Sequence, residues 1–473
     1  MKKTTKFLAA LSAVLCLSAC NMDINVPNYN SVSAEDLILN PTPASLGAAT
    51  QGLLSGARGL TANFVVNIGI WGRELYNLRP EEPRTITQQL IDPISGSTAF
   101  WSTPYSQIRN IRTVISAAEA VEALTDAERN AVLGFAYTLW AEALYHVILM
   151  HGDFGCPITT PDDPRELSPV VAEAEVYAEV LRLFDEGATY LQSGGSSFPF
   201  RMTDAMSDVA TPAGFLQVNR ALKVRTLKYM DRWTDVLATL PETFIDEAAP
   251  LTFGAWHAYS TNSGDNTNTL GGEFTVAYYA HPRFRADAQL QADGVTLDQR
   301  ALDKTYTTPE FKLLGISATE KYGGWISFNS LSAPRSWIRN EELILIRAEA
   351  NLAQGNDAAA LDDVNLIRTT SGNLAPLSGA EWNALTDDEK LSEILYNKFM
   401  SLVLEGGFTY LDARQYGRLG PDGQWADWLP RAKDADTGAD LGHVVFPRYP
   451  FPEQECITRE IETSQACQVV VGF

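Results

Sequence analysis

The sequence predicts a mainly α-helical protein, in which tetratricopeptide-like helical hairpins pack against an irregular, loop-rich region with a few short strands. Apolar residues recur at three- and four-residue spacing over several long stretches, which is the period of a buried helix face. A short turn joins two such stretches, 338–353 and 358–370, into a helical pair. Between 252 and 337 this period is lost, and aromatic, Gly, Asn and Thr residues dominate.

The first twenty residues have the composition of an export signal. Lys2, Lys3 and Lys6 precede an apolar run at 7–17, and Leu-Ser-Ala precedes Cys20. The run is shorter than the roughly 20 apolar residues that a transmembrane helix needs. A Cys after Leu-Ser-Ala resembles the bacterial lipobox, so we expect cleavage before Cys20 and acylation of its sulfur. An ordinary signal peptide with a chance Cys is the alternative.

Composition divides the chain into five segments. Residues 1–19 are the expected signal peptide, and 20–40 form a polar tether that we expect to be extended. An N-terminal helical part follows at 41–251, then the loop-rich insert at 252–337, and then C-terminal helical pairs with a loop-rich tail at 338–473. We expect the last three segments to form one folded unit, with no further membrane span.

Two sequence signatures mark helix starts. Thr125 with Glu128, and Thr386 with Glu389, have the spacing of a capping box, in which two side chains satisfy the free amides at a helix N-terminus. The first box opens a predicted helix that ends at His151. Further helices are expected at 45–60, 98–121, 172–191, 213–229 and 231–240, and the second box opens one through 405.

The chain is strongly acidic. Its formal net charge is −22, and loss of the three lysines of the signal would leave the mature protein near −25. Such a surface repels nucleic acid and anionic lipid headgroups. It suits a neutral or cationic ligand better than an acidic one, unless a local basic pocket overrides the overall charge.

Five cysteines are present. Cys16 lies in the expected signal and Cys20 is the expected lipid site. Because an exported chain meets oxidising conditions, Cys456 and Cys467 are a candidate disulfide pair that would close a short loop in the tail. A loop of that size can stabilise a fold by about 3 kcal/mol. Cys156 would then be a free, buried thiol.

Five stretches resemble, in the same order, motifs of one known family. Trp101, Tyr105 and Ile108 match a W-x3-Y-x2-I pattern, and the other stretches lie at 136–157, 338–368, 404–414 and 446–453. Together, and behind a lipobox, they resemble the SusD/RagB family of surface glycan-binding lipoproteins over nearly all of the mature chain. Two positions depart from the family pattern, because Phe408 stands where Arg is usual and Arg448 interrupts an F-P-I-P run.

The resemblance implies a location, a partner and a task. The protein would be attached to the outer membrane by lipid and would face outward. Its partner would be a SusC-type TonB-dependent barrel transporter, which it would cover as a lid. It would capture oligosaccharide, or in some members peptide, and pass it to the barrel. No cofactor, metal or nucleic acid is implied, and the protein is not expected to be an enzyme.

Aromatic residues in loops are the candidates for ligand binding. Sugar rings stack on aromatic faces, while their hydroxyls bond to polar neighbours, so a glycan site needs both. Trp101 is the first candidate, since the family's glycan site includes this vicinity, and Arg84 lies near it in the sequence. The further candidates are Trp71, Trp256, Tyr259, Tyr278, Tyr279, Trp325, Phe328 and Asn329. For each of them, packing inside the fold is the competing interpretation.

Charged residues in the family motifs suggest structure more than catalysis. We expect them to form buried or half-buried ion pairs that join the helical pairs to the rest of the fold; they are Arg347, Glu349, Arg368, Glu405, Asp412 and Arg414. A Ca²⁺ loop at Asp434, Asp436 and Asp440 would lack the glycine and terminal Glu that such loops need. A lipid-anchored glycan or peptide hydrolase and a ligand-free envelope scaffold are the alternative functions.

Overall fold

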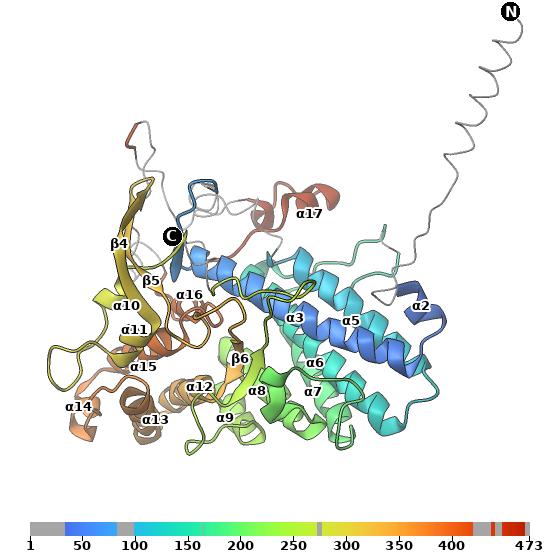
Figure 1. The fold of residues 1–473 in the computed structure, drawn as a ribbon, viewed down its shortest axis with the longest axis horizontal. Coiled ribbons are helices and arrows are strands. Elements are labelled where there is room, and N and C mark those ends of the chain that lie inside the picture. The colour runs from blue at the N-terminus through green and yellow to red at the C-terminus, as the bar shows by residue number, and fades with distance from the viewer. Residues whose placement is uncertain are drawn as a thin grey trace, which may run out of the picture.

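The structure is a computed structural model of the chain and describes residues 34–82, 99–163, 165–271, 277–419, 437–439 and 447–468. Helices dominate these residues, and the strands form two-stranded sheets (Figure 1). The predicted fold class, helical hairpins beside an irregular region with few strands, is confirmed. The signal peptide with Cys20 lies outside the described residues.

The N-terminal helices form a row in which chain neighbours are also neighbours in space. The row consists of α3 (Pro43–Trp71), α5 (Ser102–Ala120), α6 (Asp126–His151) and α7 (Glu173–Gln192). Each of these helices packs against the next (Figure 1). This is the arrangement that amphipathic helical hairpins need in order to bury their apolar faces.

The row continues into the C-terminal half. It runs from α8 (Pro212–Tyr229) through α9 (Trp233–Thr239) to α12 (Asn340–Ala353), which packs against both α13 (Asp357–Thr370) and α15 (Asp387–Leu402). The α12–α13 hairpin confirms the helical pair predicted at 338–353 and 358–370. The insert therefore leaves the row at α9 and returns to it at α12.

Helix α6 is the central core helix. Asp126–Phe154 is long and apolar enough to cross a membrane by length and composition alone, with a mean hydropathy of 1.4. However, 89% of its most apolar window is buried inside the fold. Its apolar character is thus explained by packing against α3, α5, α7 and α8.

Both predicted capping boxes are present. The Glu128 amide donates to the Thr125 hydroxyl at 3.2 Å, and the Thr125 amide donates to the Glu128 carboxylate at 2.9 Å. The box at Thr386 and Glu389 repeats this pattern at 3.3 and 2.7 Å. These reciprocal bonds fix the starts of α6 and α15 at the residues that the sequence indicated.

Three antiparallel sheets of two strands lie outside the helical row. The pairs are β1 (Leu75–Asn77) with β3 (Tyr278–Ala280), β2 (Gly254–His257) with β6 (Arg335–Arg339), and β4 (Thr305–Leu313) with β5 (Ile316–Tyr322). The β4–β5 hairpin is longer than the short strands expected in the insert. It turns at Leu314 and Gly315, which both have positive φ, at 49° and 81°.

Shorter helical elements complete the described chain. They are α2 (Ala34–Leu39), η3 (Gly152–Phe154), η4 (Asp204–Val209), η5 (Leu240–Glu242), α10 (Arg283–Ala286), α11 (Gln299–Lys304), α14 (Gly379–Ala384), α16 (Phe408–Gln415), α17 (Glu453–Thr458) and η8 (Gln465–Cys467). Helix α2 corrects one expectation. The end of the predicted tether is helical and packs against α5, because Leu37 is buried there.

Buried ion pairs join the helical hairpins, as predicted. Lys398 donates to Glu349 at 2.6 Å and lies 2.8 Å from Asp412, and Lys228 contacts the same two carboxylates. All four side chains are almost fully buried. This quartet, named here the Lys–acid quartet, connects α8, α12, α15 and α16.

The other predicted charged residues have similar roles, with one exception. Arg347 bonds Asp363 at 2.6 Å, Arg368 pairs with Glu393, and Glu405 bonds Arg339 at 2.7 Å. Arg414 instead donates to the Pro447 carbonyl at 3.4 Å and lies over the Tyr410 ring.

Candidate ligand-binding site

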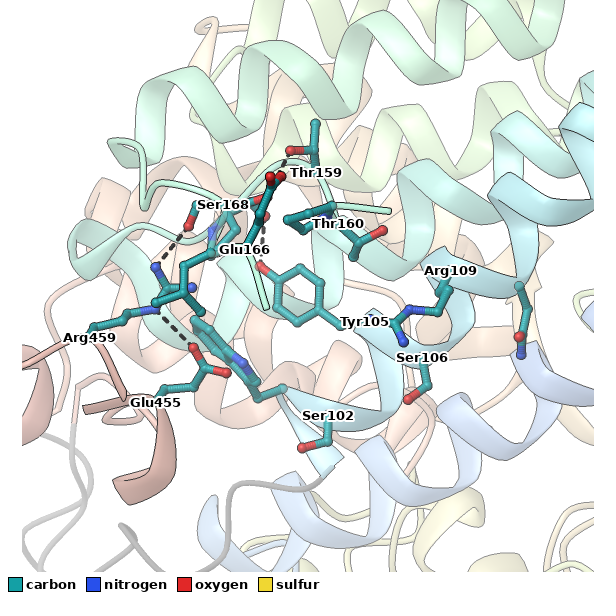
Figure 2. Close-up of a pocket in the computed structure, with 15 residues that line it drawn as sticks. Ser102, Tyr105, Ser106, Arg109, Thr159, Thr160, Glu166, Ser168, Glu455 and Arg459 are labelled. Atoms are coloured by element: carbon teal, nitrogen blue, oxygen red, sulfur yellow. Dashed lines mark hydrogen bonds and ion pairs between the residues drawn. The ribbon is translucent and has the colours of Figure 1, made fainter. Parts of the chain in front are cut away.

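A cavity of about 480 Å³ lies where α5 begins, between a loop at 157–168 and the short helix α17 (Figure 2). The segments that line it are far apart in the sequence. One wall is the first half of α5, the second is the loop that follows α6, and the third is the described C-terminal segment. The size falls within the range of small-ligand pockets.

The α5 wall carries a row of side chains on one face. Ser102, Tyr105, Ser106 and Arg109 are three or four positions apart, so the helix turn brings them together (Figure 2). Trp101 is the N-cap residue of α5, and it lines the cavity although it is only 4% exposed. The predicted residue Trp101 is therefore at the cavity, with its ring mostly covered.

The loop wall is fixed at its base. Cys156 and Val171 form an antiparallel bridge, with N–H···O distances of 3.3 and 3.2 Å. Gly155 makes this close approach possible, because a Cβ there would lie 1.9 Å from the Val171 oxygen and its φ is +69°. Within the loop, the Thr159 and Ser168 hydroxyls are 3.1 Å apart.

Helix α17 supplies the third wall through a charged pair. The Arg459 Nε donates to the Glu455 carboxylate at 2.9 Å, and another Arg459 nitrogen donates to the Ser168 carbonyl at 2.8 Å. Arg459 thus connects α17 to the loop wall. Figure 2 shows this pair on the opposite side of the cavity from Arg109.

An aromatic cluster forms the floor. Trp101 lies 5.2 Å from Tyr105, 5.1 Å from His151 and 4.8 Å from Phe451, measured between ring centroids. Burial lowers the pKa of His151 to about 4, so its ring is neutral near pH 7. Its Nδ1 is 2.7 Å from the Tyr449 carbonyl oxygen.

The polar groups of the cavity suit a ligand rich in hydroxyls. Serine and threonine hydroxyls, an amide and two guanidinium groups face it. Arg109 and Glu166 are exposed, and neither side chain makes an ion pair within the described part of the chain. The positive charge of Arg109 is balanced by the negative charge of Glu166. The cavity is therefore not expected to prefer an anionic ligand over a neutral one.

The buried thiol beside the cavity is unsuited to nucleophilic chemistry. Burial raises the pKa of Cys156 to about 12, although a hydrogen bond with Tyr105 lowers it in part. The reactive species of cysteine is the thiolate. Cys156 therefore stays protonated near neutral pH and acts as a small core residue.

Most of the other predicted ligand residues lie elsewhere, and several are buried. Trp71 is fully buried beneath Phe100, Tyr410 and Tyr449, so it has no free face for a ligand. Trp256, Tyr259, Tyr279 and Phe328 are also buried, Tyr278 and Trp325 are half-buried, and Asn329 is exposed. Arg84 lies outside the described residues.

Two of these aromatics lie beside a second cavity, of about 340 Å³, next to the middle of α3. The Tyr259 hydroxyl donates to the Arg58 carbonyl at 3.2 Å, and Trp256 is the neighbour of His257. Arg58 pairs with Asp265, which comes from the polar loop after β2. This cavity has no exposed aromatic ring among its lining residues.

The remaining candidates lie around the insert. Tyr278 pairs with Asn77 across the β1–β3 sheet, and Tyr279 stacks on Phe311 at 5.6 Å. Lys304 lies over the Trp325 ring at 4.7 Å. The predicted residues that the structure describes are thus not brought together, and among them only Trp101 borders the 480 Å³ cavity.

Several cavity residues could not be identified from the sequence. Arg109 and Ser106 lie on the polar face of a helix, and the sequence of such a face indicates only that it is exposed to solvent. Glu455 and Arg459 are more than 340 positions away from them. The one usable signal was the candidate disulfide at Cys456, which indicated an ordered tail.

Within the described residues, no group of three or more His, Cys, Asp or Glu side chains is placed to hold a metal ion. Asp434, Asp436 and Asp440 lie outside the described residues.

Comparison with known proteins gives a consistent picture of the fold. No protein-family model and no curated protein matches the chain. Among solved structures, a SusD superfamily protein from Bacteroides vulgatus covers 89% of this chain and 97% of its own, with 15% identity and a TM-score of 0.64. A SusD-like carbohydrate binding protein from Bacteroides fragilis has 12% identity and a TM-score of 0.65, with coverages of 88% and 98%.

A SusD-like carbohydrate binding protein from Bacteroides vulgatus gives 16% identity and a TM-score of 0.62 over 89% of this chain and 97% of its own. All three similarities extend over almost the whole of the compared proteins, so they concern the overall fold and not one local motif. The chain therefore has the fold of the SusD superfamily.

Proposed function

We propose that this protein is a surface lipoprotein that binds oligosaccharide in the α5–α17 cavity and delivers it to a SusC-type TonB-dependent barrel, which it covers as a lid. The observation that carries the proposal is a polar cavity, bordered by Trp101, in a fold shared with proteins described as carbohydrate binding. The cavity groups match the hydroxyls of a neutral glycan.

The anchor and the location rest on the N-terminal sequence. A basic head, a short apolar run and Leu-Ser-Ala before Cys20 support export and acylation. A single acyl chain binds membranes only weakly, so several chains would be needed for a stable anchor. An acidic body would then stay off the anionic membrane surface and face the medium.

We infer that the protein binds its ligand without changing it. In the cavity, the Glu455 carboxylate is engaged by Arg459, and beside the cavity the Cys156 thiol is held protonated by burial. The similar proteins are described as carbohydrate binding. A glycan hydrolase would need two carboxylates set apart across the scissile bond, and one of the two cavity carboxylates is engaged in an ion pair.

The test is a binding screen of the soluble mature body, from residue 21, against arrays of neutral and acidic oligosaccharides and peptides. Arg109→Ala removes an exposed cavity guanidinium without opening the core. Arg232→Ala is the matched control, because its partly exposed guanidinium pairs with Asp235 away from the cavity. Trp101→Ala is less suitable, since Trp101 packs in the aromatic floor.

The proposal predicts that wild type and Arg232→Ala bind the same oligosaccharide, while Arg109→Ala binds it about tenfold more weakly, which corresponds to one charged hydrogen bond. Equal affinity of all three proteins would place the ligand elsewhere. Binding of peptides alone would overturn the glycan assignment, and release of shortened glycans would favour a hydrolase.

A further inference from the structure

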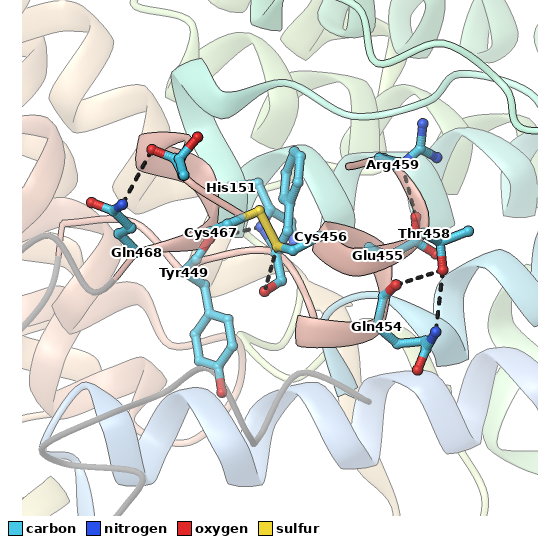
Figure 3. Close-up of a disulfide and its surroundings, with 11 residues drawn as sticks. His151, Tyr449, Gln454, Glu455, Cys456, Thr458, Arg459, Cys467 and Gln468 are labelled. Carbon is cyan, nitrogen blue, oxygen red and sulfur yellow. Dashed lines mark hydrogen bonds and ion pairs between the residues drawn. A yellow bond between two sulfur atoms is a disulfide. The ribbon is translucent and has the colours of Figure 1, made fainter. Parts of the chain in front are cut away.

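We infer that the Cys456–Cys467 disulfide positions the α17 wall of the ligand cavity, so that Arg459 can contribute to ligand affinity. The inference rests on the proposed function for its ligand, but its structural part can be tested without one. The structure joins the two sulfur atoms across a sequence separation of 11 residues (Figure 3).

Helix α17 cannot hold its own position. It has six residues, whereas isolated helices shorter than about 12 residues are marginal in water. Its N-cap residue is Pro452, which makes no side-chain cap hydrogen bond. The helix must therefore be fixed by contacts with the rest of the protein.

Two backbone hydrogen bonds and the disulfide contribute to fixing it. The Tyr449 amide donates to the Met150 carbonyl at 2.8 Å, which ties the segment before α17 to the end of α6. The Phe451 amide, just before α17, donates to the Ala466 carbonyl at 2.7 Å, next to Cys467. The disulfide then joins α17 itself to η8, and both cysteines are buried.

The disulfide lies next to the side chains that face the cavity. Cys456 follows Glu455 directly and precedes Arg459 by three positions, which is less than one helical turn. Figure 3 shows Cys456 and Glu455 on α17, and Arg459 is the C-cap residue directly after this helix. Fixing Cys456 therefore fixes both members of the charged pair.

Loss of the disulfide should loosen this wall while the helical row stays folded. The core of the row is formed mainly by residues of α3, α5, α6, α7 and α8, and the two cysteines are only two members of the same large apolar cluster. A freed α17 would carry Arg459 away from the Ser168 carbonyl, where it now donates at 2.8 Å. A ligand would then have to order the wall on binding, and that lost preorganisation lowers affinity.

The structural test is hydrogen–deuterium exchange of the mature body and its Cys456→Ala/Cys467→Ala variant. We expect amides in 449–461 to exchange at least tenfold faster in the variant, while α12 and α13 keep wild-type rates. Ile457→Ala is the matched control, since it alters an exposed residue of α17, 49% accessible, and keeps the disulfide. Unchanged exchange at 449–461, or an equal increase in α12 and α13, would overturn the inference.

The functional test is a mutant cycle with the oligosaccharide that the wild type binds best. Arg459→Ala, the double cysteine variant and the triple variant are compared by calorimetry. We expect each of the first two to weaken binding about tenfold, and the triple variant to bind no more than about twofold more weakly than Arg459→Ala. If the triple variant instead binds about a hundredfold more weakly than wild type, the two losses of affinity are independent. The disulfide would then not act through Arg459, and the inference would be overturned.

The two proposals fail in different ways. If the wild type binds no oligosaccharide, the proposed function fails, and the exchange experiment alone decides whether the disulfide holds the α17 wall. If oligosaccharide binds and the double cysteine variant binds it with wild-type affinity, the disulfide inference fails and the proposed function stands.

Discussion

Individual residues at the cavity show how backbone geometry and burial prepare the site. Gly155 allows the close approach that fixes the base of the loop wall. His151 stays neutral beneath the cavity because burial lowers its pKa. Neither residue faces the ligand in our proposal, yet each fixes the position of a group that does.

Gly155→Ala should destabilise the protein by about 1–3 kcal/mol, because a Cβ would meet the Val171 oxygen and the φ of +69° is unfavourable for alanine. Urea unfolding followed by circular dichroism measures this. Gly52→Ala is the control, since that position in α3 has open space and should gain up to about 1 kcal/mol. Equal stability of the two variants would contradict the role given to Gly155.

His257 should make the fold sensitive to acid. Burial, helped by the nearby charges of Arg58 and Arg335, lowers the pKa of His257 to about 3 from an ordinary 6.5. Below pH 6.5 the unfolded chain therefore binds a proton that the folded protein does not, so stability falls as the pH falls. Between pH 6.5 and 5 the loss from this group is about 2 kcal/mol.

The measurement is the free energy of unfolding of wild type and His257→Gln at pH 8, 6.5, 5 and 4. The variant should be less stable than wild type at pH 8. The difference between their free energies of unfolding should become smaller as the pH falls. Parallel curves would show that His257 does not titrate in this way.

At the scale of elements, buried ion pairs between charged side chains join neighbouring helices. The Lys–acid quartet links α8, α12, α15 and α16 where the sequence predicted ion pairs. Burial alone would raise the pKa of Asp412, but Lys228 and Lys398 outweigh it and lower the pKa below its ordinary value. Asp412 is therefore ionised in the folded protein near neutral pH.

Lys398→Met should destabilise the fold by about 3–5 kcal/mol, because it leaves Glu349 and Asp412 with one lysine between them in a buried site. Lys312→Met is the control: that lysine is 66% exposed in β4, and its pair with Glu310 should contribute less than about 1 kcal/mol. Chemical denaturation of both variants measures the change in the free energy of unfolding that each substitution causes. A loss below 1 kcal/mol for Lys398→Met would show that the quartet is not a structural link.

The elements also show which features can be predicted from sequence. Long helices such as α6 and α15 were predictable because their apolar period and their capping boxes are local signals. The β4–β5 hairpin was not, because β4 is largely exposed on both faces and shows no alternating pattern. The site was predictable only at Trp101, since Arg459 reaches the cavity through contacts between remote segments.

On the scale of the whole molecule, we propose a lipid-anchored N-terminus that is followed by an acidic helical body with a ligand cavity. The described residues bury their apolar surface without a partner or a membrane, apart from scattered exposed residues such as Ile38 and Leu39. In the proposed arrangement, attachment depends on the N-terminal lipid.

Replacing Cys20 by Ser should release the protein from membranes, because acylation needs the sulfur. Wild type should be found in the outer-membrane fraction and be cleaved by protease added to intact cells. Cys16→Ser, which changes only the expected signal peptide, is the control and should stay membrane-bound. Firm attachment of Cys20→Ser, or complete protection from added protease, would contradict the proposed anchor and its orientation.

The central claim is that this protein captures ligand for a barrel transporter, and one measurement tests it most directly. Wild-type protein carrying an affinity tag is purified from detergent-solubilised outer membranes of its native host, and its partners are identified by mass spectrometry. The account predicts a TonB-dependent barrel in about equimolar amount. Recovery of the lipoprotein alone, or with partners that include no barrel transporter, would contradict it.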